Sequence, residues 1–98
     1  MGRAMSIASV LAALRKEYAP TLRQEVNNLE VALEGDDLPA ARRIAHRLSG
    51  TAGSFGFREA STAARAVEEA MDANNPAALR VALAELKNRA EIANPDIG

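Results

Sequence analysis

Residues 38–57, LPAARRIAHRLSGTAGSFGF, form the stretch that decides the fold. Apolar residues recur in it every three or four positions, which is the spacing of one helix face; they are Leu38, Ala41, Ala45, Leu48, Ala52 and Phe55. Asp36 or Asp37 can cap the start of this helix, and Gly56 can end it in the left-handed conformation. The stretch therefore predicts one amphipathic helix with a buried apolar face.

Helical spacing continues on both sides of this stretch, and no segment alternates as a strand would. On the N-terminal side we expect helices over residues 6–18 and 21–34, because Pro20 lacks the amide proton that a helix interior needs. Thr21 and Gln24 have the spacing of a capping box at the start of the second of these helices. The sequence therefore predicts a helix boundary at Pro20.

On the C-terminal side, we expect helices over residues 57–72 and 76–90, the latter capped by Asn75. Short connections between consecutive helices favour antiparallel neighbours. The predicted fold is therefore all-α: an up-and-down antiparallel four-helix bundle with the helix over residues 6–18 as an additional N-terminal helix that covers it.

The composition fits a single domain over residues 1–98 whose ends, near 1–5 and 94–98, fray. Hydrophobic residues make up 48% of the chain and aromatic residues 3%, which favours closely packed helices rich in alanine and leucine. A net charge of −1 argues against nucleic acid as a partner, and the absence of cysteine excludes disulfides and thiol catalysis. The apolar run Met5–Leu14 is too short to span a membrane, so we expect a cytoplasmic protein without membrane insertion.

The only histidine, His46, is expected on the polar side of its helix, roughly 150° from the centre of the apolar face at 100° per residue. Arg42, Gly50 and Gly53 fall within about 40° of it on the same helical wheel. Each glycine costs a helix about 0.5–1 kcal/mol relative to alanine, so a reason is needed for two of them. We interpret them as clearing the approach of a partner to His46; the alternative is close helix packing.

A neutral imidazole can act as a nucleophile toward phosphorus. The guanidinium groups of Arg42, Arg43 and Arg47 can stabilise phosphoryl charge or meet an acidic partner, although a solvated helix face is the alternative. These residues together favour phosphoryl chemistry at His46.

The segment resembles the signature of the histidine-containing phosphotransfer (HPt) domains of two-component phosphorelays. The residues that carry the resemblance surround the histidine and continue into the next helix: Ala45, His46, Leu48, Gly50, Ala52, Gly53, Gly56, Val67 and Glu68. The resemblance implies that His46 is phosphorylated by the aspartyl phosphate of one receiver domain and passes the phosphoryl group to another.

The resemblance also implies a phosphocarrier without independent catalytic machinery and without a metal or cofactor of its own, since the partner receiver supplies magnesium. Its implied partners are response-regulator receiver domains and a hybrid sensor histidine kinase. Ser49, Arg42 and Arg43 are the expected phosphoryl environment. Gly50, Gly53 and Arg47 are the expected docking residues.

One position departs from the family pattern, which usually has lysine three residues after the histidine where this chain has Ser49. Arg42 or Arg43 can replace the missing cation, or Ser49 can donate a hydrogen bond. The departure supports a second hypothesis, a helical adaptor that docks receiver or other signalling domains without being phosphorylated. A single histidine without cysteine or an assured acidic neighbour builds neither a hydrolase triad nor a typical metal site.

Overall fold

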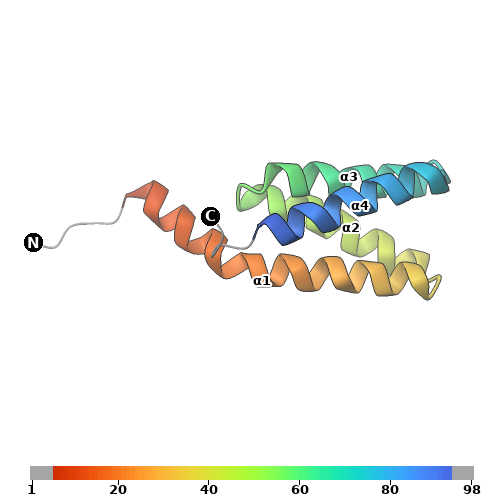
Figure 1. Cartoon of the computed structure of the whole chain (residues 1–98), viewed down its shortest axis with the longest axis horizontal. Coiled ribbons are helices and arrows are strands. Elements are labelled where there is room, and N and C mark those ends of the chain that lie inside the picture. Colours follow the sequence, from red (N-terminus) through yellow and green to blue (C-terminus); the bar gives the residue numbers. More distant parts are fainter. Residues whose placement is uncertain (1–5, 94–98) are drawn as a thin grey trace, which may run out of the picture.

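The computed structural model describes residues 6–93, which form four helices and no strand (Figure 1). In chain order the helices are α1 (Ile7–Glu34), α2 (Leu38–Ser54), α3 (Arg58–Asp72) and α4 (Pro76–Ile92). Each helix contacts the next one along the chain, and α4 also contacts α1. The prediction of an all-α helical bundle is therefore confirmed. The ends expected to fray lie outside the described residues.

The predicted helix boundary at Pro20 is wrong, because α1 continues through this residue. Proline cannot donate the helical hydrogen bond to the carbonyl of Lys16, but both residues are exposed, so water can hydrate that carbonyl. Figure 1 shows that α1 changes direction in its orange part, as helices commonly do at a proline. The expected capping box is also absent, because the Gln24 side chain donates to Asn28 Oδ1 at 3.1 Å.

The N-terminal part of α1 projects beyond the other three helices (Figure 1). At about 1.5 Å per residue, its 28 residues span about 42 Å, whereas 15–17 residues in each of the others span about 25 Å. Every residue from Ile7 to Glu17 is exposed, and we call this stretch the overhang. The expectation that an N-terminal helix covers the bundle is therefore wrong: the overhang leaves its own apolar residues in solvent.

The core is built from small and branched aliphatic side chains. Its largest fully buried members come from all four helices: Leu22 and Leu29 in α1, Leu48 in α2, Val67 in α3 and Leu86 in α4. On α2, the predicted apolar face is buried at Ala41, Ala45, Leu48 and Ala52. Burying one leucine contributes about 1.5–3 kcal/mol to the free energy of unfolding. The buried face that contains Leu48 therefore fixes the rotation of α2 about its axis.

The turns hold the helices in register. Asp37 caps α2 by accepting a hydrogen bond from the amide of Ala40 at 3.3 Å, and Asn75 caps α4 as predicted. Gly56 has a φ of +86°, so the turn between α2 and α3 uses the left-handed conformation that favours glycine. Beside this turn, Phe55 stacks on Tyr18 with the ring centroids 4.4 Å apart. This stack connects the α2–α3 turn to α1.

Candidate functional site

His46 projects from the exposed side of α2, as the helical wheel predicts. Its side chain is 73% exposed, whereas the preceding residue, Ala45, is completely buried. The buried face of α2 therefore turns the imidazole outward. A molecule approaching this side of the bundle can reach the ring directly.

Glu68 on α3 holds one of the two ring nitrogens of His46. Its Oε2 lies 2.9 Å from His46 Nδ1, and its side chain is only 14% exposed. An ionised carboxylate only accepts hydrogen bonds, so in this contact Nδ1 carries the proton and donates. In the neutral ring the lone pair then resides on Nε2. No other described residue bonds Nε2, which leaves a nucleophilic nitrogen facing the solvent.

Arg42 lies one helical turn before His46 and forms ion pairs with two acidic residues of α3, Glu68 and Asp72. Its Nε donates to Asp72 Oδ1 at 2.8 Å and its Nη2 to Asp72 Oδ2 at 3.0 Å, while Nη2 lies 3.4 Å from Glu68 Oε2. The side-chain hydrogen bond from Arg42 lowers the pKa of Asp72 below its ordinary value, and the same bond raises the pKa of Arg42. Both groups therefore remain charged at neutral pH.

These four side chains form two facing pairs. Arg42 and His46 are four residues apart on α2, and Glu68 and Asp72 are four residues apart on α3, so each pair lies on one helix face. Arg42 and Asp72 are equally far along the chain from Phe57, and so are His46 and Glu68. The turn between α2 and α3 thereby brings each member of one pair opposite a member of the other.

The remaining polar residues predicted for the site are arranged differently. Arg47 donates from Nε to Glu25 Oε1 at 2.9 Å and so connects α2 to α1, while its side chain stays 58% exposed; its docking role stays a prediction. The Ser49 hydroxyl donates to the backbone carbonyl of His46 at 2.8 Å. The donor expected to reach a phosphoryl group is thus used inside the helix, as serine hydroxyls often are. Arg43 is exposed and forms no ion pair with any described residue.

The two glycines near His46 have different surroundings. A Cβ added at Gly50 would meet nothing within 4 Å, so the surface one turn beyond His46 is open. A Cβ added at Gly53 would lie 3.1 Å from Ser61 Oγ on α3. The interpretation as clear approach therefore fits Gly50, whereas at Gly53 the close packing of α2 on α3 explains the missing side chain. Ser61 uses this proximity to donate to the carbonyl of Ser49 at 2.5 Å.

The site thus joins His46, Arg42 and the open surface at Gly50 with two carboxylates that the sequence analysis did not include among the site residues, Glu68 and Asp72. Residues 6–93 contain no group of three or more histidine, cysteine, aspartate or glutamate side chains placed to hold a metal ion. In the same range, no helix has both the length and the apolar character needed to cross a membrane.

Comparison with known proteins identifies the family. The sequence model described as Hpt domain matches residues 13–94. No curated protein and no solved structure matches the chain. Hpt domains are phosphocarriers that take part in histidine phosphotransfer with receiver domains and histidine kinases in phosphorelays. Since the match includes all four helices up to their ends, apart from the first residues of α1, the chain belongs to the Hpt domain family.

Proposed function

We propose that this chain relays phosphoryl groups between receiver-domain aspartates through Nε2 of His46. The observation that carries the proposal is the exposed imidazole whose Nδ1 is bound by Glu68, so that Nε2 faces the solvent. We further propose that the protein works in the cytoplasm and that its helices have the up-and-down order favoured by the three short turns.

In the proposed transfer, the Nε2 lone pair attacks the phosphorus of a receiver aspartyl phosphate. The Nε2–P bond forms, the bond between phosphorus and the aspartate oxygen breaks, and the carboxylate leaves with its electron pair. The proton on Nδ1 stays in place, so the phosphorylated ring gains a positive charge beside the Glu68 carboxylate. This electrostatic contact stabilises the charge that develops during the reaction. Transfer to a second receiver reverses these steps.

The neighbouring residues are assigned supporting roles. Arg43, exposed beside His46, is available to the phosphoryl oxygens, and Arg42 orients Glu68 while balancing its charge. Gly50 admits the surface of the receiver. The receiver supplies the magnesium ion, and this chain holds no metal or cofactor of its own.

The proposal is tested by mixing the purified chain with ³²P-labelled phosphorylated receiver domains from its source organism. We expect label on the chain that is stable to base and labile to acid, as phosphohistidine is. His46→Gln should remain unlabelled, whereas Arg80→Gln, a matched change at an exposed residue of α4, should be labelled like the wild type.

Binding to receivers without any label would contradict the proposed transfer. That result would favour the adaptor hypothesis, in which the surface around Gly50 docks a receiver but His46 accepts no phosphoryl group. The replacement of the usual lysine by Ser49, whose hydroxyl donates to the carbonyl of His46, is the feature that motivates this alternative.

A further inference from the structure

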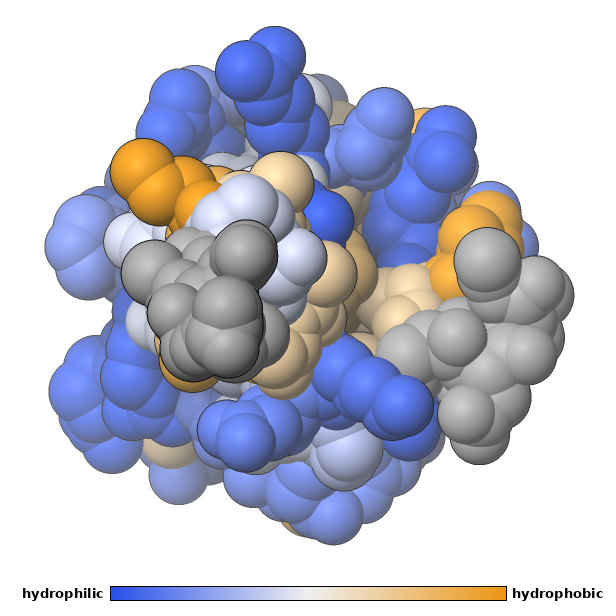
Figure 2. All heavy atoms as spheres, turned by 90° about the vertical axis from the view of Figure 1, so that its left-hand side faces the viewer, coloured by the Kyte–Doolittle hydropathy of each residue, from blue (hydrophilic) through white to orange (hydrophobic). Residues whose placement is uncertain are grey.

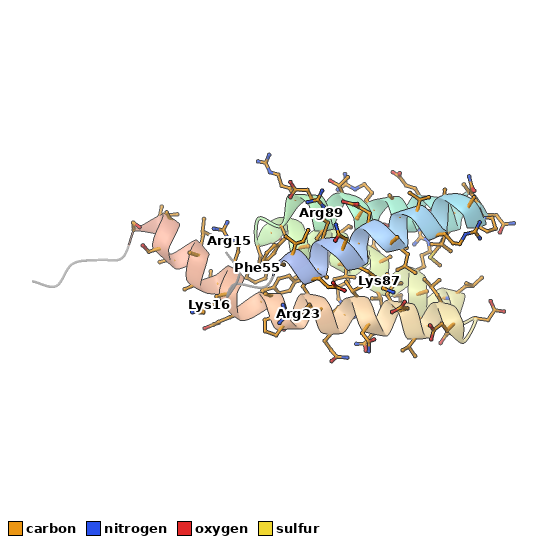
Figure 3. All side chains as sticks on the ribbon, in the orientation of Figure 1. Arg15, Lys16, Arg23, Phe55, Lys87 and Arg89 are labelled. Carbon is orange, nitrogen blue, oxygen red and sulfur yellow. The ribbon has the colours of Figure 1, made fainter. Side chains whose placement is uncertain are left out.

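Charged side chains cover much of the molecule, whose surface is mostly blue when viewed from the end toward which the overhang points (Figure 2). Figure 3 shows two of the cations on α4, Lys87 and Arg89. Lys87 pairs with Glu30 of α1, and Arg89 pairs with Glu85 one turn before it. Exposed ion pairs of this kind contribute little to stability. A pair therefore indicates a role only where it reaches a functional group.

The pair of Arg42 and Asp72 differs, because its guanidinium also reaches the carboxylate that holds His46. Arg42 Nη2 lies 3.0 Å from Asp72 Oδ2 and 3.4 Å from Glu68 Oε2. This Oε2 is the same oxygen that lies 2.9 Å from His46 Nδ1. The imidazole and the guanidinium therefore share one oxygen of Glu68, and a movement of either group changes the contact of the other.

Asp72 determines how closely Arg42 approaches Glu68. It accepts two hydrogen bonds from Arg42, from Nε at 2.8 Å and from Nη2 at 3.0 Å, which is the two-point geometry that guanidinium and carboxylate groups favour. The distance of 3.4 Å to Glu68 is longer than a charge-assisted hydrogen bond. Without the charge of Asp72, Arg42 can make its two-point contact with Glu68 instead and draw this carboxylate away from the imidazole.

The position of Asp72 is not explained by its own helix. It is the last residue of α3, where the negative end of the helix dipole disfavours a carboxylate. Within α3, residues 58–72, no basic side chain lies in the last turn to offset this charge, and the cation comes from α2. We propose that Asp72 is a positioning residue: by binding Arg42 at two points, it keeps Glu68 on Nδ1 of His46. The inference rests on the proposed function, in which Nε2 is the nitrogen that has to remain free.

The positioning role is tested by ¹⁵N NMR of the unphosphorylated, histidine-labelled chain in mildly alkaline buffer, where the two ring resonances report which nitrogen carries the proton. We expect Asp72→Asn to lower the ratio of Nδ1-protonated to Nε2-protonated ring about twofold to threefold, as coupling within one hydrogen-bond network allows. Arg42→Gln should lower the ratio less, because it leaves no guanidinium to compete for Glu68. The double variant should equal Arg42→Gln, since Asp72 then has nothing to hold.

Glu69→Gln is the matched control, because it removes a carboxylate from an exposed position of the same helix. Asp72 is itself 51% exposed, and circular dichroism verifies that each variant keeps the fold. A ratio in Asp72→Asn equal to that of the wild type overturns the proposal. So does an equal shift in Glu69→Gln, or a double variant that falls as far as Asp72→Asn, because Asp72 would then not act through Arg42.

This measurement needs no phosphoryl donor, so it separates the positioning role from the proposed transfer. If Asp72→Asn shifts the proton as expected but no receiver labels His46, the transfer is wrong and the positioning role stands. If receivers label His46 and Asp72→Asn leaves the ring unchanged, the positioning role is wrong and the transfer stands.

Discussion

At the residue scale, the contact between His46 and Glu68 determines which nitrogen is available for chemistry. The 2.9 Å bond assigns the proton to Nδ1 and leaves Nε2 unprotonated in the neutral ring. The exposure of the ring follows from the helical wheel of α2, so it could be predicted from the sequence. The carboxylate comes from another helix, and the spacing within α2 contains no information about it.

Glu68→Ala should slow phosphorylation of His46. Without the carboxylate the neutral ring populates both tautomers, and the charge on the phosphorylated ring loses its partner. We expect a loss of about 1 kcal/mol, or about fivefold in rate, because the bond is partly exposed. Labelling rates with phosphoramidate measure this directly. Glu69→Ala, at the adjacent exposed position, is the control, and equal rates for both variants would contradict the assigned role.

Gly50 offers a test that separates docking from chemistry. Gly50→Ala should stabilise the domain by about 0.5–1 kcal/mol in chemical denaturation, since its Cβ would meet no neighbour. Gly50→Gln should slow transfer from a phosphorylated receiver while leaving phosphorylation by phosphoramidate unchanged. Equal receiver transfer in the wild type and Gly50→Gln would remove Gly50 from the docking surface.

Asp72 gives a prediction for pH. The hydrogen bond from Arg42 lowers the pKa of Asp72 below 3.8. The pair therefore stabilises the folded state fully when the pH is above the pKa that Asp72 has in the unfolded chain. This stabilisation is lost as the pH falls through the pKa of the folded state. In a ¹³C NMR titration of the carboxyl groups, Arg42→Gln should move the midpoint of Asp72 up toward 3.8. Identical midpoints in both proteins would show that the bond is absent in solution.

At the scale of elements, the sequence predicts helix faces better than it predicts helix partners. Periodicity and caps give α2, α3 and α4 to within one or two residues, because each amphipathic face and each terminal signal is local. Arg42 and Asp72 carry opposite charges and lie equally far along the chain from Phe57. This spacing is the signal in the sequence that could have indicated the facing pairs. Using that signal requires knowing that α2 and α3 pack around this turn.

Pro20 shows how packing can override a local signal. Tyr18, Ala19 and Leu22 are buried on both sides of it, so the bundle holds the helix together where the local preference would interrupt it. Pro20→Ala restores the missing hydrogen bond to the carbonyl of Lys16. We expect a gain of about 1 kcal/mol, part of the roughly 3 kcal/mol that proline costs a helix interior, and a rise in Tm of about 4–8 °C.

Thermal unfolding followed by circular dichroism measures this change, with Thr21→Ala as the control for helix propensity alone. A lower Tm for Pro20→Ala would contradict the expectation. It would mean that the bend of α1 is required for the stacking of Tyr18 on Phe55, and that this stacking outweighs one helical hydrogen bond.

At the scale of the whole molecule, the sides of the bundle differ in their chemistry. The α2–α3 side carries His46 with its arginine and carboxylates, whereas the overhang exposes aliphatic side chains to solvent. The composition predicts the alanine-rich core, because a chain with few aromatic residues has to bury small and branched side chains. The overhang could not be predicted in the same way, since its apolar face looks identical in sequence to a buried one.

The proposed transfer requires that Nε2 of His46 is the atom that receives the phosphoryl group. It is tested most directly by ¹⁵N–¹H NMR of the histidine-labelled chain before and after phosphorylation by a receiver, because this chain has a single imidazole. We expect the Nε2 resonance to shift and to couple to phosphorus while Nδ1 stays protonated. Phosphorus bonded to Nδ1, or an imidazole spectrum that does not change, would contradict it.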